Sequence, residues 1–84
     1  MHYVYIIKSK KNKKIYIGCT NDLRKRVSKH NQNKSEYTKF NGPWEVRYYE
    51  AFFSKEDAFG RESKLKKNAR GLQELKKRTK KSLE

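Results

Sequence analysis

Four side chains near the start of the chain are of the types that phosphodiester chemistry uses. Tyr5 and Tyr16 carry phenols, Arg26 a guanidinium and His30 an imidazole. An arginine can bind phosphate oxygens through two parallel hydrogen bonds, and a histidine can hold a water, a phenol or a phosphate. Phosphodiester hydrolysis also needs a base for the attacking water, compensation of the developing charge and usually a divalent metal. The function therefore depends on whether the fold brings these groups together.

The sequence predicts a hairpin that places the two phenols side by side. Residues 2–7 and 14–18 have strand patterns, and the polar residues 9–13 between them form a connection short enough for an antiparallel hairpin. Alternation of side chains puts Tyr5 on one face of the first strand, and Tyr16 and Gly18 on one face of the second. Tyr5 and Tyr16 are therefore expected to be neighbours on one face.

A helix is expected next, with Thr20 or Asn21 as its cap and Asp22 in its first turn. Four residues recur at i, i+3, i+4 and i+7 and so share one face: Leu23, Arg26, Val27 and His30. This spacing places Arg26 and His30 on or beside the inward face of the helix.

The rest of the chain predicts one strand and two helices. Residues 31–43 are a polar connection that ends in a turn, and residues 44–53 form the longest strand, apolar enough to be central in the sheet. Ser54 caps the helix that follows. One face of this helix carries Ala58, Phe59, Glu62, Leu65 and Ala69. Gly71 marks the break before a basic helix at about 71–82, which turns inward Leu72, Leu75 and Thr79.

The element order ββαβαα predicts an α+β fold in which a three-stranded antiparallel sheet is flanked by helices. No internal repeat or linker divides the chain, so residues 1–84 are expected to form a single domain. The last two residues, Leu83 and Glu84, are interpreted as an expression remnant.

The charge of the chain favours a polyanionic partner. Net charge is +14, and half of it lies in residues 60–84, which contain ten Lys or Arg against three Glu. Such a surface attracts nucleic acid through release of counterions. A solvated, solubilising face or an anionic membrane surface is the alternative. The expected nucleic-acid contacts are Lys25, Arg70, Lys76, Lys77 and Arg78.

The single cysteine and the hydropathy pattern limit the remaining possibilities. Cys19 excludes an intramolecular disulfide and fits a reducing compartment. No stretch approaches the roughly 20 apolar residues of a membrane span, so a cytoplasmic protein without membrane contact is expected.

Tyr48 and Tyr49 can stack on nucleobases, but adjacent strand residues face opposite ways, so at least one of them belongs to the core.

Each candidate site residue also has a purely structural interpretation. Either tyrosine can be a core residue with its hydroxyl at the surface, and Arg26 can lie over the sheet. His30 can cap a helix end, and Glu62 can pair with a nearby Lys or Arg. Glu62 is nevertheless the one carboxylate placed on a buried helical face, and Mg²⁺ prefers such oxygen ligands. Their joint arrangement is harder to explain without a function than any one residue alone.

The motif Tyr3-Val4-Tyr5, followed by Tyr16-Ile17-Gly18 and then by Leu23, Arg26, His30 and Glu62, resembles the GIY-YIG nuclease domain. The resemblance covers nearly the whole chain and is strongest to short stand-alone bacterial proteins. It also extends to the excinuclease C subunit and to homing endonucleases. Two positions depart from the family pattern. Tyr3 stands where the first motif begins with glycine, and Asn68 lies nearer to Glu62 than the asparagine that assists the site in several members.

The resemblance implies a role for each residue. Tyr5 or Tyr16 would act as the general base or position it, Arg26 would stabilise the scissile phosphate, and His30 would match a histidine that several members carry. Glu62 would bind one divalent ion, Mg²⁺ or Mn²⁺.

The resulting prediction is a metal-dependent endonuclease that acts on DNA more readily than on RNA, in DNA repair or nucleic-acid processing, with a protein partner that supplies specificity. The rival is a non-catalytic DNA- or RNA-binding module that keeps the nuclease scaffold. A scaffold for an acidic protein partner is a third interpretation.

Overall fold

The computed structural model describes residues 1–32 and 38–84, so residues 33–37 of the polar connection predicted at 31–43 lie outside the described part. Its elements follow the order ββαβααα, one helix more than the sequence predicts. They are β1 (His2–Ser9), β2 (Ile15–Thr20), α1 (Leu23–Asn31), β3 (Trp44–Phe52), α2 (Lys55–Lys67), α3 (Ala69–Arg78) and α4 (Lys80–Leu83). The predicted α+β fold with a three-stranded antiparallel sheet is confirmed.

The strand order is β2-β1-β3, so the central strand is β1 and not the strand at 44–52 as the sequence suggests. β1 pairs antiparallel with both neighbours, and the register sets Tyr5 opposite Gly18 of β2 and Tyr49 of β3. The burial explains the order, because Val4 to Ile7 of β1 are all buried while most of β3 is only half-buried. The length and aromatic content of β3 therefore do not indicate a central position in the sheet, and that prediction was wrong.

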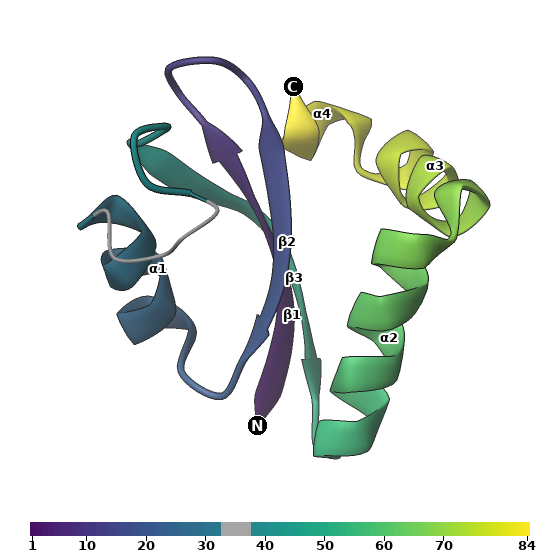
Figure 1. Ribbon diagram of the computed structural model, residues 1–84. Helices are drawn as coiled ribbons and strands as arrows, with labels where there is room; N and C mark the ends of the chain where they lie inside the picture. The colour runs from purple at the N-terminus through teal and green to yellow at the C-terminus, as the bar shows by residue number, and fades with distance from the viewer. Residues whose placement is uncertain (33–37) are drawn as a thin grey trace.

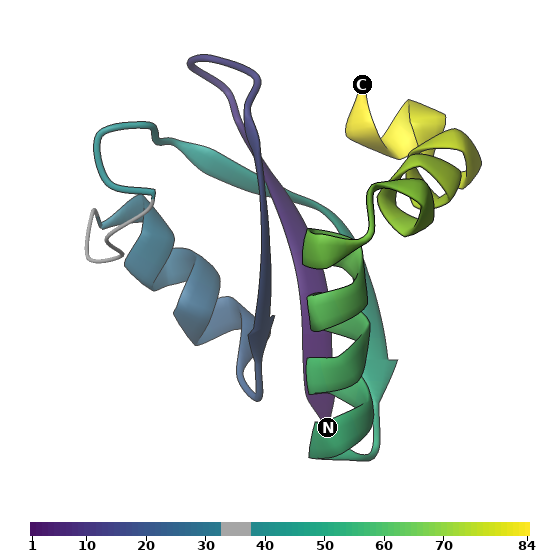
Figure 2. The ribbon, with the colours of Figure 1, turned by 45° about the vertical axis from the view of Figure 1, so that its right-hand side comes forward.

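The sheet separates two layers of helices (Figure 1). Helix α1 covers one face, and helices α2, α3 and α4 lie on the other. The same separation is visible after the molecule is turned (Figure 2). We call these the α1 face and the α2 face of the sheet.

The α2 face carries the larger apolar core, which comprises Val4, Ile6, Ile17, Ala58, Leu65 and Leu75. Half-buried Cys19, Leu72 and Leu83 pack against it, so the chain end contributes to the fold. The α1 face has a smaller cluster of Tyr5, Ile7 and Trp44, against which pack Tyr16, Leu23, Val27 and Val46. Alternation along β1 thus distributes its residues between two different cores.

Two local predictions need correction. Helix α1 is capped by Asp22, whose Oδ1 accepts from the Lys25 amide at 3.1 Å, and not by Thr20 or Asn21. The break before α3 falls at Asn68, whose Oδ1 accepts from the amides of Arg70 and Gly71, so the break precedes Gly71. A side-chain cap satisfies amides that a new helix leaves unpaired, which explains the earlier break.

The predicted inward face of α2 is only partly confirmed. Ala58 and Leu65 are buried and Glu62 is half-buried, but Phe59 is 49% exposed and its ring lies under the Lys55 ammonium at 5.4 Å. The side chain of Ala69 lies outside the described part. Across residues 1–32 and 38–84, no helix has the length and apolar character needed to cross a bilayer.

Candidate active site

The centre of the site is the contact between Tyr5 and Gly18 across strands β1 and β2. Tyr5 has no exposed surface, and its ring lies over the backbone of Gly18, its register partner. A Cβ at position 18 would overlap the Oη and Cζ atoms of Tyr5. Gly18 is therefore required by the close approach of the phenol, which gives the glycine of the second motif a steric role.

His30 is held between two hydroxyl groups inside the α1 face. Its Nε2 lies 2.8 Å from the Tyr5 hydroxyl and its Nδ1 lies 2.7 Å from Thr38 Oγ1, and the imidazole is fully buried. Thr38 is fixed in turn by the Trp44 indole, which donates to its carbonyl at 3.0 Å. The sequence predicts a water, a phenol or a phosphate as the partner of His30, and the structure shows a phenol, that of Tyr5.

Burial and the nearby Arg26 guanidinium lower the pKa of His30 to about 4, so the imidazole is neutral at neutral pH. Arg26 can only donate, and its interaction with Tyr5 leaves the phenol proton for His30 Nε2. The Nδ1–H then donates to Thr38. These directions form one continuous chain of donors and acceptors from Tyr5 through His30 to Thr38.

Arg26 acts on both phenols. Burial raises the pKa of Tyr5 to about 12, against the lowering effect of Arg26. Burial also opposes the charge of Arg26, but its interactions with Tyr5 and Tyr16 outweigh this effect and raise its pKa. Tyr5 is therefore protonated at neutral pH, and Arg26 keeps its charge beside it.

Tyr16 lies at the margin of this cluster, on the edge strand β2. Its ring centroid is 6.5 Å from that of Tyr5 and 5.1 Å from that of His30, and the residue is half-buried. The predicted same-face neighbourhood of the two phenols is confirmed. Tyr16 is the more accessible of the two because β2 has a strand on only one side.

Glu62 reaches the same edge from the other layer. Helix α2 covers the α2 face, and Glu62 forms an ion pair with Lys66, one turn further on, at 3.1 Å. The Lys66 ammonium lies 5.5 Å from the centroid of the Tyr16 ring, and the charge of Glu62 contributes to the raised pKa of Tyr5. The two layers therefore meet at the outer edge of β2, with Lys66 between Glu62 and Tyr16.

The donor set suits a hard cation bound through few protein ligands. Within the described ranges, no three His, Cys, Asp or Glu side chains cluster in a way that could hold a metal ion. A site with a single carboxylate leaves most positions to water and phosphate oxygens, as Mg²⁺ accepts. Glu62 fits that role in chemistry and position, and Lys66 competes with a cation for it.

The basic residues expected to contact nucleic acid lie in two places. Lys25 and Arg26 line a recess of about 160 Å³ together with Lys29 and the residues at the start of α1. Four others belong to α3, on the opposite side of the sheet from α1 (Figure 1): Arg70, Lys76, Lys77 and Arg78. The structure thus places Lys25 in one recess with Arg26 and the α3 residues on the other side of the sheet.

Three participants were missed in the sequence. Lys66 stands four residues after Glu62, and this helical spacing is a signal for an ion pair. Lys29 follows Lys25 at the same spacing on α1 and lines the recess with it. Thr38 gave no signal, because its contact with His30 depends on a loop conformation. Asn68, which departs from the position of the asparagine in the family, caps α3.

The phenol packed on a glycine, and the arginine and histidine one helical turn apart, lie at the motif positions that resemble a nuclease domain. A family model described as the GIY-YIG catalytic domain matches residues 1–80. The chain therefore belongs to the GIY-YIG family of nuclease domains, as its motifs predict.

Similar proteins are short bacterial members of this family. The chain is 42% identical over 71 residues to the UPF0213 protein CPE1444 of Clostridium perfringens, covering 83% of this chain and 75% of that protein. It is 43% identical over 75 residues to the UPF0213 protein YazA of Bacillus subtilis, covering 88% and 75%. The solution NMR structure of the UPF0213 protein BH0048 from Bacillus halodurans superposes with a TM-score of 0.53 at 35% identity, over 88% of this chain and 81% of that one.

Proposed function

We propose that this protein is a metal-dependent endonuclease that hydrolyses phosphodiester bonds of DNA, in DNA repair or nucleic-acid processing in the cytoplasm. The observation that carries the proposal is the hydrogen-bonded cluster of Tyr5, His30 and Thr38 with Arg26 beside it. Both ring nitrogens of the buried His30 are hydrogen-bonded, and these bonds fix the orientation of the imidazole and of its partners Tyr5 and Thr38. The cluster thus holds a guanidinium at a site accessible from the recess beside Lys25.

Arg26 would bind the scissile phosphate. Its neighbour Tyr5 is protonated at neutral pH, so this hydroxyl orients the guanidinium without compensating its charge. A fixed cation that faces the phosphate stabilises the additional charge of the transition state. Removal of one such group typically lowers the rate by about 10²- to 10³-fold.

Tyr16 would contact the attacking water. Tyr5 has no exposed surface and a raised pKa, so it suits the role of a positioning residue for Arg26 and His30. Tyr16 is half-buried at the sheet edge and adjoins both the Arg26 and the Glu62 sides of the site. It is therefore the phenol that a water on the phosphate can reach.

Glu62 would hold the Mg²⁺ or Mn²⁺ ion. Such an ion polarises phosphate oxygens and lowers the pKa of a bound water. For Glu62 to bind it, Lys66 must release the carboxylate, and its ammonium can then turn to the phosphate or to solvent. Because Lys66 is exposed and Glu62 is only half-buried, breaking their ion pair costs little free energy.

Plasmid and single-stranded DNA, incubated with the protein in Mg²⁺ or Mn²⁺, test this proposal. We expect nicking that falls about 10²-fold or more in Arg26→Ala and in Glu62→Gln. Glu56→Gln is the matched control, because it removes a charge from an exposed position of the same helix. Nicking that persists unchanged in both site variants would exclude the mechanism.

The ion pair between Glu62 and Lys66 favours a second candidate, a non-catalytic DNA- or RNA-binding module. In that protein the carboxylate would only stabilise helix α2. Binding that depends steeply on salt and survives Glu62→Gln, with no cleavage of any substrate, would support it. A protein partner that supplies specificity is compatible with both candidates. A scaffold for an acidic protein would instead require that nucleic acid fails to bind even at low salt.

A further inference from the structure

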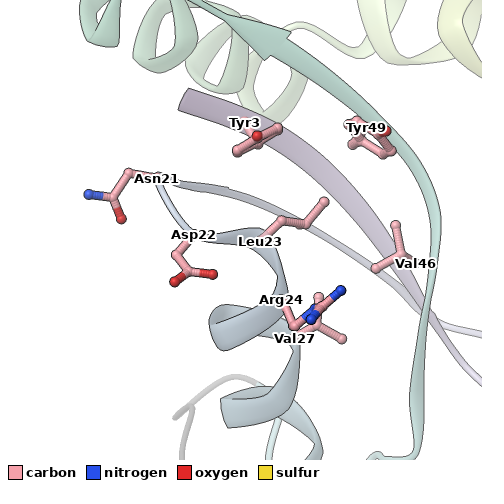
Figure 3. Close-up of a pocket in the computed structure, with 8 residues that line it drawn as sticks. All are labelled: Tyr3, Asn21, Asp22, Leu23, Arg24, Val27, Val46 and Tyr49. Carbon is pink, nitrogen blue, oxygen red and sulfur yellow. The ribbon is translucent and has the colours of Figure 1, made fainter. Parts of the chain in front are cut away.

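A second concave surface lies on the α1 face, on the side of α1 away from Tyr16. It is a groove of about 650 Å³ between the start of helix α1 and strands β1 and β3, and Figure 3 shows the side chains that border it. This volume is within the usual range for small-molecule sites. The site described above uses few of the residues that line it, which are Tyr3, Asn21, Asp22, Leu23, Arg24, Val27, Val46 and Tyr49.

The wall formed by the sheet is aromatic. The rings of Tyr3 and Tyr49 meet edge to face, with centroids 6.0 Å apart and planes at 67°. Tyr49 is 55% exposed although Leu23, Val27 and Val46 form an apolar surface beside it. An exposed aromatic ring next to an apolar surface suits a flat, heteroaromatic ligand that can stack on it.

The rim of the groove can form hydrogen bonds with such a ring. Arg24 provides a guanidinium at the rim, whereas the side chains of Asn21 and Asp22 point away from the two tyrosine rings (Figure 3), and the Asp22 carboxylate caps helix α1. A guanidinium is one of the side-chain groups that read the edges of nucleobases.

The groove adjoins the phosphate recess. Asn21 and Asp22 line both, because the start of α1 separates the two. On the sheet, Tyr49 is the direct cross-strand partner of Tyr5. A strand with one phosphate at Arg26 therefore has a neighbouring base within reach of Tyr49. The net charge of +14 favours such a polyanion over an apolar peptide.

We propose that this groove binds an unpaired base of the nucleic-acid strand whose phosphate lies at Arg26. The position of that phosphate rests on the proposed function, whereas the affinity of the groove for a base does not. The preferred substrate is then a single-stranded or locally unpaired segment, because a base within a duplex is not available to stack on Tyr49.

Binding of two oligomers with the same backbone charge isolates the contribution of the bases. Fluorescence anisotropy would compare labelled oligothymidine with an abasic oligomer of equal length, in EDTA and at one salt concentration. Stacking of one base is worth roughly 5- to 150-fold in affinity. We expect Tyr49→Ala to weaken oligothymidine binding by a factor in this range and to leave abasic binding unchanged. Phe53→Ala is the control, because Phe53 is a 94% exposed aromatic residue outside the groove.

Methyl chemical shifts of the unmodified protein provide a second readout that does not depend on the folding of a variant. Oligothymidine should shift the methyl signals of Leu23, Val27 and Val46, and the abasic oligomer should not. Oligouridine serves as the RNA arm of both measurements. Equal affinity of wild type and Tyr49→Ala for oligothymidine, or methyl signals that do not respond, would overturn the proposal and leave an apolar peptide as the occupant.

The same samples separate this proposal from the nuclease proposal. Binding in EDTA requires no cleavage, and Glu62→Gln should bind oligothymidine at least as tightly as wild type. Base-dependent binding without plasmid nicking would retain the groove and reject the nuclease. Nicking without base-dependent binding would do the reverse.

Discussion

The two faces of the sheet bury different kinds of side chain. The α2 face buries Val4, Ile6, Ala58 and Leu65, all apolar and at most 2% exposed. The α1 face buries, with no exposed surface, Tyr5, His30 and Thr38 in one hydrogen-bonded chain. Alternate residues of the same central strand supply both faces.

The contrast shows how a small domain can hold a polar site. Burial of polar groups is unfavourable unless each finds a partner, and the chain from Tyr5 to Thr38 provides these partners. The apolar face supplies most of the stabilising burial, at roughly 25 cal/mol for each Å² removed from water. The α1 face is then free to hold groups selected for chemistry.

Replacement of Leu65 by Ala should produce the largest loss of stability. Leu65 is 1% exposed in the core of the α2 face, and such truncations cost about 2–5 kcal/mol. Urea unfolding would measure the loss. Phe59→Ala on the same helix removes a ring that is 49% exposed and should cost less than about 1 kcal/mol. Equal losses would contradict the placement of the apolar core.

Acid should destabilise the protein through the α1 face. The pKa of His30 is about 4 in the folded protein, below its value of about 6.5 in an unfolded chain, so the unfolded state takes up the proton first. The contribution of His30 is complete above pH about 6.5 and is lost as the pH falls to about 4, at a cost of up to about 3 kcal/mol.

Urea unfolding at pH 7 and at pH 4.5 would measure this effect in wild type and in His30→Gln. The variant should lose less stability between the two pH values, since Gln does not titrate. Identical pH dependence in both proteins would show that His30 is not held neutral.

Two identical substitutions should have opposite effects on the two sides of the sheet. Gly18→Ala places a methyl group against the buried Tyr5 ring and should cost about 1–3 kcal/mol. Gly60→Ala, in helix α2, has no heavy atom within 4 Å of the added Cβ and should stabilise by about 0.4–1 kcal/mol. Thermal unfolding would distinguish them, and a neutral Gly18→Ala would contradict the contact with Tyr5.

Lys66→Met should have the smallest effect on stability. Loss of the ion pair with Glu62 costs about 0.2–0.5 kcal/mol. Under the proposed function, removal of the competing ammonium should lower the Mg²⁺ concentration for half-maximal cleavage by about 2- to 5-fold. Lys64→Met, at an exposed position of the same helix, should leave the metal requirement unchanged. A higher requirement in Lys66→Met would instead mean that Lys66 assists metal binding.

The sequence predicted the α1-face cluster well because its residues follow local periodicities. Alternation in the hairpin placed Tyr5 beside Tyr16, and helical spacing placed Arg26 and His30 on the inward side of α1. The asymmetry between Tyr5 and Tyr16 was not predictable, since burial of Tyr5 depends on β1 being flanked by two strands.

Other features depend on contacts between distant parts of the chain. The pairing of β1 with β3 joins residues that lie 35 to 50 positions apart, and alternation alone does not encode it. The same pairing brings Tyr3 next to Tyr49 and forms the groove. Lys66 was within reach of prediction, because its spacing from Glu62 is visible in the sequence. The sequence predicts the helix break at Gly71 because glycine is a strong breaking signal, whereas the capping side chain of Asn68 sets the break in the structure.

The rate of DNA cleavage in Tyr16→Phe tests the central claim most directly. The substitution removes one hydroxyl at the place where the α1 face meets Glu62, and it keeps the ring that packs there. With Mg²⁺ present, we predict a rate at least about 100-fold below wild type, with an unchanged melting temperature. Cleavage at the wild-type rate by this variant would contradict the account.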